Sequence, residues 1–233
     1  TWNRFATRWP KHADRQGLYH EWENSTMTNA TGVADRPSAS VDEVTVADLD
    51  NDSLILRLTF TINHLSRWLT PIHDPARLIR SPRRGEPSVK ELLLELRNEE
   101  LRIFPRMHLM TVQTTPDLDK LPTFTLTPAQ VAHDQQSTPL EVMAEFRRLR
   151  QSTISLLRSL VDAAWERRGA SRREHDWTIR GLAEHLVAHD VAVLSDIDVT
   201  LDRIGAREGI ADVSRVHLPE LLALLPVRSR TER

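Results

Sequence analysis

The sequence contains no cysteine among its 233 residues. Disulfides, thiolate-ligated metal sites, CxxC redox chemistry and a cysteine nucleophile are therefore all excluded. Any thiol chemistry performed by this chain must take its sulfur from another molecule.

Long apolar runs and lysine-rich clusters are also missing. No stretch approaches the roughly 18 apolar residues of a membrane span, and the first residues, TWNRFATRWPKHADR, are too charged for a signal peptide. Only 3 of the 31 basic residues are lysine, and acidic and basic residues are interleaved to give a net charge of −2. We therefore expect a cytoplasmic protein that binds neither nucleic acid nor a membrane.

Glycine-rich phosphate loops, a GxSxG nucleophile motif and internal repeats are absent as well. The chain is nevertheless 39% hydrophobic, which is enough to form one hydrophobic core. Residues 1–46 lack a sustained apolar period, and Asn24–Ser40 is rich in Ser, Thr, Asn and Ala. We predict a disordered N-terminal tail over residues 1–46. Met27 is an alternative candidate for the first residue of the biological chain.

Four later segments have the apolar spacing of amphipathic helices. The first runs from about Asp50 to Pro71; its Thr59–Ile62 stretch is β-prone, but the apolar period extends over more than fifteen residues and favours a helix. The second starts at the capping box Ser88–Glu91 and the third at Thr138–Glu141. The third is predicted to reach about Glu166, and the fourth to span about Thr178 to Ile204.

The connection over residues 111–137 contains three prolines and little periodicity. A connection of this length fits a crossover between two parallel helices. We therefore predict an all-α four-helix bundle over residues 47–207. Residues 208–233 form a C-terminal extension, in which His217–Leu225 predicts a short helix.

The fourth helix carries an HxxxH motif, His185 and His189. Residues four apart lie on one helix face, so both imidazoles can bind one metal ion. The second helix supplies Glu95 among leucines, where a carboxylate is costly unless it is paired or binds a cation. Alternatively, the two histidines are ordinary core histidines that bind no metal. The alternative for Glu95 is that its carboxylate is exposed to water or pairs with Arg102.

Two histidines and one carboxylate would form a facial triad with open positions for water or substrate. Glu99, Glu100 and Asp190 are then candidates to orient an imidazole or act as a base. The alternative for each of them is a solvated helix face.

Residues 48–207 resemble the DinB-like superfamily of metal-binding four-helix bundles. The resemblance is most specific in the fourth helix, where Trp177–Arg180 leads to Glu184, His185, His189 and Asp190. It implies an up-down-down-up bundle and a metal held by three histidines. His185 and His189 match two of these, and Glu95 stands at the third position.

A carboxylate in place of an imidazole adds negative charge and shifts the preference from zinc or nickel toward iron or manganese. Alternatively, the site is degenerate and binds no metal. The resemblance implies a thiol S-transferase or thiol-dependent isomerase that uses a low-molecular-weight thiol such as mycothiol or bacillithiol. In such an enzyme the metal lowers the pKa of the thiol, which then reacts with a small-molecule electrophile.

The sequence thus leaves two hypotheses of different classes. The first is a metal-dependent thiol enzyme with Glu95, His185 and His189 as ligands. The second is a non-catalytic, homodimeric helical bundle that presents an apolar face to a partner.

Overall fold

The computed structural model describes residues 45–226 and 228. Except for residues 45 and 46, the predicted tail lies outside the described residues, as does Met27. Every helix in the described part is too short or too polar to cross a bilayer.

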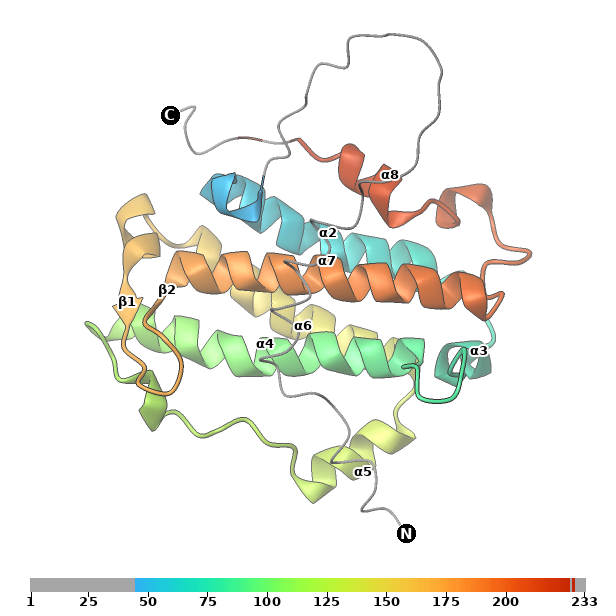
Figure 1. The fold of residues 1–233 in the computed structure, drawn as a ribbon, viewed down its shortest axis with the longest axis horizontal. Helices are drawn as coiled ribbons and strands as arrows, with labels where there is room; N and C mark the ends of the chain where they lie inside the picture. Colours follow the sequence, from blue (N-terminus) through green and yellow to red (C-terminus); the bar gives the residue numbers. More distant parts are fainter. Residues whose placement is uncertain (1–44, 227, 229–233) are drawn as a thin grey trace, which may run out of the picture. The chain divides into compact units, whose positions relative to one another are not determined.

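Four long helices form the bundle shown in Figure 1. Helices α2 and α7 run in one direction and α4 and α6 in the other. Within the bundle, α2 packs against α6 and α7, and α4 packs against the same two helices. This is the predicted up-down-down-up arrangement, and the all-α fold class is confirmed. The bounds are α2 (Asn51–Leu69), α4 (Val89–Val112), α6 (Pro139–Arg158) and α7 (Ile179–Arg203).

Side-chain caps set the start of these helices. The Ser88 backbone N–H donates to Glu91 Oε2 at 2.7 Å, and Glu91 N donates to Ser88 Oγ at 3.3 Å. Thr138 and Glu141 form the same reciprocal pair at the start of α6. Both capping boxes read from the sequence are therefore present, and each satisfies backbone groups that the first helical turn leaves free. The β-prone stretch Thr59–Ile62 lies inside α2.

The third long helix is shorter than the sequence predicted. It ends at Arg158, where Ser159 Oγ donates to the Leu156 carbonyl at 2.7 Å and Ser159 N bonds to three preceding carbonyls. The chain then forms a separate 3-10 helix, η3 (Asp162–Glu166), that buries Trp165. A helix that ends at Arg158 and is followed by η3 buries both Leu157 and Trp165. The apolar pattern therefore does not distinguish this arrangement from one continuous helix.

Short elements connect the long helices. The connections contain α3 (Pro75–Ile79) and the antiparallel strands β1 (Arg168–Gly169) and β2 (Trp177–Thr178), none of which the sequence analysis predicted. The remaining elements are η1 (Val46–Asp48), η2 (Leu118–Lys120), α5 (Pro128–Gln136), η4 (Asp212–Ser214) and α8 (Leu218–Ala223).

The segment after α7 is anchored to the bundle by polar groups. Trp68 Nε1 donates to the Val216 carbonyl at 2.9 Å, and Asp198 Oδ2 accepts the Leu218 N–H at 2.8 Å. The Arg207 guanidinium lies 5.2 Å from the Trp68 ring centroid and forms an ion pair with Asp198. These contacts hold α8 against α7.

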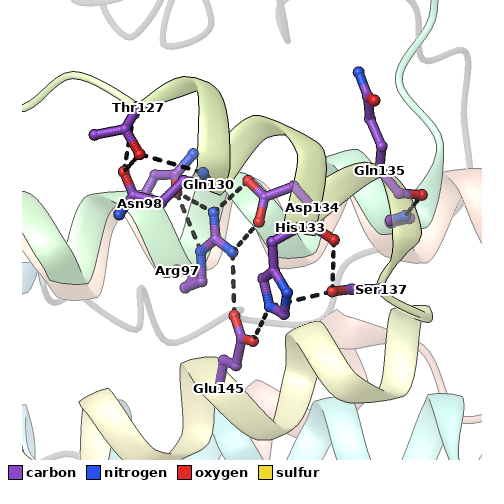
Figure 2. A network of polar contacts seen from close by, with 10 residues as sticks. Arg97, Asn98, Thr127, Gln130, His133, Asp134, Gln135, Ser137 and Glu145 are labelled. Atoms are coloured by element: carbon purple, nitrogen blue, oxygen red, sulfur yellow. Dashed lines mark hydrogen bonds and ion pairs between the residues drawn. The ribbon is translucent and has the colours of Figure 1, made fainter.

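The crossover between α4 and α6 is fixed by a buried arginine. Figure 2 shows Arg97 of α4 between Asp134 of α5 and Glu145 of α6. Arg97 Nη2 donates to Asp134 Oδ2 at 2.7 Å, Nη1 donates to Glu145 Oε2 at 3.1 Å, and Glu145 Oε1 lies 2.8 Å from His133 Nε2. Hydrogen bonds to Asp134 raise the pKa of Arg97, and they outweigh burial, which lowers it. One guanidinium thus joins three helices.

Replacing Arg97 by glutamine is expected to release α5 before the rest of the bundle unfolds. The variant leaves Asp134 buried without its counter-charge, which favours local opening. Amide hydrogen exchange in residues 128–136 should accelerate by at least about tenfold, while that in α7 changes little. Arg147→Gln, at an exposed position of α6, is the control, and unchanged exchange in α5 would contradict the role given to Arg97.

Candidate functional site

The predicted ligands come from two antiparallel helices that face each other. Glu95 and Glu99 lie one turn apart on α4, and His189 and His185 lie one turn apart on α7. Because α4 and α7 run in opposite directions, Glu95 faces His189 and Glu99 faces His185. The nitrogen–oxygen distances are 3.6 Å for Glu95 Oε1–His189 Nε2 and 2.6 Å for Glu99 Oε1–His185 Nε2.

His189 is the unusual member of this group. Both its ring nitrogens are buried and neither has a hydrogen-bond partner. Burial lowers the pKa of the imidazole, but the carboxylates of Glu95, Glu99 and Asp190 outweigh it and raise that pKa above its usual value. An unsatisfied buried polar group costs about 1–3 kcal/mol, so its retention calls for a ligand or a charge that compensates it.

Glu99 and His185 are engaged differently. Arg102 forms an ion pair with Glu99, and its Nη2 lies 3.2 Å from His185 Nε2. Burial opposes ionisation of Glu99, yet hydrogen bonds with His185 and Arg102 hold the pKa of this carboxyl well below its usual range. Glu99, predicted to orient an imidazole or act as a base, therefore contacts His185 directly, and Arg102 pairs with Glu99.

Asp190 and Glu100 face a different part of the bundle. Asp190 accepts hydrogen bonds from Thr61 and Arg150, and Glu100 accepts them from Arg150 and Thr153. The alternative of a solvated face is wrong for both, since their residues are only 2% and 0% exposed. Their hydrogen bonds are those of a polar core beside the histidines.

Two further residues at the site were not predicted as members of it. Glu174, in the loop between β1 and β2, lies 3.8 Å from Arg102 Nη1 and binds Arg106 through both carboxylate oxygens. Trp177 Nε1 donates to Glu174 at 2.9 Å, and the Trp177 ring meets the His185 ring edge-on at 5.8 Å. Because Glu174 lies in a loop without periodicity, no sequence signal connects it to the histidines.

The donor set suits a divalent cation in its chemistry. Imidazoles and carboxylates are the ligands of zinc, nickel, iron and manganese. Two ligand atoms at about 2.1 Å from one tetrahedral ion are about 3.4 Å apart, close to the Glu95–His189 distance of 3.6 Å. Within residues 45–226 and 228, however, no three histidine or acidic side chains are already grouped around one point. Arg102 lies against both Glu99 and His185.

A family model and the structure of YfiT agree with this architecture. Residues 57–192 match the model of the DinB superfamily. YfiT from Bacillus subtilis, described as a probable metal-dependent hydrolase with an unusual four-helix bundle topology, is 18% identical with a TM-score of 0.56, over 74% of this chain and 94% of that chain. A mycothiol-dependent maleylpyruvate isomerase is 14% identical with a TM-score of 0.48, over 73% and 68%.

A sequence comparison with curated proteins gives no match. The family model alone covers more than half of the chain, from within α2 to the residues that follow His189 in α7. On this match, the chain belongs to the DinB superfamily.

Proposed function

We propose that this protein is a metal-dependent enzyme of the thiol S-transferase type. Glu95, His185 and His189 would hold a divalent cation such as zinc, nickel, iron or manganese. When bound, that cation supplies a positive charge that stabilises the thiolate of a low-molecular-weight thiol at neutral pH. The cosubstrate would be mycothiol, bacillithiol or a related thiol, and the second substrate a small electrophile.

The observation that carries this proposal is the state of His189. Its imidazole is buried, has no hydrogen-bond partner and lies at a ligand-to-ligand distance from Glu95. Glu99 and Arg102 are placed to position His185, because both contact its Nε2. The absence of cysteine fits an enzyme whose sulfur comes from a cosubstrate.

The direct test measures bound metal in protein purified without a metal-binding tag. We expect close to one divalent ion per chain by elemental mass spectrometry, lost in Glu95→Ala and in His189→Ala. His108→Ala, an exposed histidine on α4, is the matched control and should keep the metal. Retention of metal in both site variants would show that these residues are not the ligands.

The second candidate is a non-catalytic homodimeric bundle. One observation favours it: Arg102 already supplies a cation to Glu99 beside His185. In that case, wild-type protein should contain no metal and take up none of the four ions. Light scattering should then show a dimer that a chelator does not affect.

A further inference from the structure

A second candidate site lies next to the histidines. A cavity of about 510 Å³ lies between α4, the start of the crossover and the loop between β1 and β2. Its volume is in the range of small-molecule sites, about 300–1,000 Å³. Its lining combines apolar side chains, such as Leu121, Pro122 and Phe124, with charged residues.

The basic residues that line the cavity are arginines, called the arginine cluster below. Arg102, Arg106 and Arg173 line it, together with the carboxylates of Asp119 and Glu174. Asp119 binds the loop itself, because it accepts the Arg172 N–H and the Ser171 hydroxyl, each at 2.8 Å. Glu174 is therefore the carboxylate that the structure places on the arginines.

The contacts of Glu174 are those of carboxylate recognition. Arg106 donates from Nη1 and Nη2 to the two oxygens at 2.8 and 2.9 Å, a bidentate pairing specific for planar anions. The Glu174 side chain is 35% exposed and comes from a short loop rather than from a long helix. An external carboxylate can take its place at Arg106 with no net change in the charge of the arginine cluster.

The location of the cavity connects it to the histidines. Arg102 lines the cavity and also lies 3.2 Å from His185 Nε2. Trp177 binds Glu174 on one side and meets the His185 ring on the other. Arg102 and Trp177 therefore connect the carboxylate position at Arg106 to His185.

We propose that this cavity binds an organic carboxylate with an apolar body, held by Arg106 and Arg102 in place of Glu174. The apolar body lies along Phe124 and its neighbours in the crossover. Glu174 occupies the carboxylate position of the free protein and is displaced when the ligand binds. The binding needs no metal, so it stands apart from the proposed metal centre.

The test titrates the full chain with hexanoate and, in parallel, with the uncharged hexanamide. Binding is followed by calorimetry and by tryptophan fluorescence, which should respond because Trp177 loses its hydrogen bond to Glu174. We expect saturable binding of hexanoate only, and a fluorescence change that Trp177→Phe removes. Equal affinity for hexanoate and hexanamide would overturn the proposal.

Two variants with opposite expected effects make the test specific. Glu174→Gln removes the competing charge and should bind hexanoate at least fivefold more tightly, whereas Arg106→Met should bind it at least tenfold more weakly. Arg147→Met, exposed on α6, is the control. If Glu174→Gln does not bind more tightly, Glu174 does not occupy the carboxylate position.

The titrations are run both in EDTA and with added zinc. Hexanoate binding in EDTA by a protein that takes up no metal supports the cavity and contradicts the metal centre. A protein that contains stoichiometric metal but does not bind hexanoate supports the metal centre and contradicts the cavity.

Discussion

Arg150→Met is expected to lower the free energy of unfolding by about 3–5 kcal/mol. Arg150 is fully buried on α6 and binds carboxylates from two other helices, Glu100 of α4 and Asp190 of α7. Its Nη2 donates to Asp190 Oδ1 at 2.9 Å, and Thr61 of α2 donates to Asp190 Oδ2 at 2.7 Å. All four helices of the bundle thus meet at one polar cluster.

The expected loss is large because the substitution leaves two carboxylates buried without their counter-charge. Burial already raises the pKa of Glu100, an effect that Arg150 opposes and Asp190 reinforces. Without the guanidinium, at least one carboxyl must take up a proton or be exposed to water, and both cost free energy.

Urea unfolding followed by circular dichroism measures the change. Arg147→Met, at an exposed position of the same helix, should change stability by less than about 0.5 kcal/mol. The triple variant Arg150→Met, Glu100→Gln, Asp190→Asn should recover part of the loss, because the charges are removed together. A loss of less than about 1 kcal/mol in Arg150→Met would mean that water reaches the cluster.

The polar cluster illustrates what the sequence could and could not predict about the fold. The capping boxes and the apolar period located the four helices, because these signals are local. Arg150 lies at helical spacing from the buried Phe146 and Leu157, and this position on the apolar face is a signal that could have identified it. The end of α6 depended on Ser159 and on the docking of Trp165, which periodicity does not encode.

For the candidate site, too, the sequence predicted which residues lie on which helix face but not which of them pair. The spacing of His185 and His189 and the position of Glu95 among leucines indicated which face each would occupy. Which carboxylate meets which imidazole depends on the axial offset between α4 and α7, and no sequence pattern sets that offset. Glu174 reaches the site through a loop after a two-residue strand, so its contribution required the three-dimensional structure.

Acid is expected to destabilise the protein partly through one histidine of α2, His64. This residue is 3% exposed, and its Nδ1 is buried without a hydrogen-bond partner. Burial, together with Arg67 and Arg57, lowers the pKa of His64 to about 4. The histidine is therefore neutral in the folded protein at pH 7, packed between Phe60 and Trp68.

The direction of the effect follows from the two pKa values. In the unfolded chain His64 titrates near its ordinary value of about 6.5, so between about pH 6.5 and pH 4 the unfolded state binds more protons than the folded state. Stability contributed by neutral His64 is present above about pH 6.5 and is lost as the pH falls toward 4. From pH 7 to pH 5 we expect this one group to account for about 1–2 kcal/mol.

The variant His64→Leu isolates this contribution, because leucine fills a similar apolar volume and does not titrate. Urea unfolding of both proteins at pH 7, 6 and 5 gives two stability profiles that share every other ionisable group. The wild type should lose about 1–2 kcal/mol more than the variant between pH 7 and pH 5. Parallel profiles would mean that His64 accepts a proton in the folded bundle as readily as in the unfolded chain, and that water or a counter-charge reaches its Nδ1.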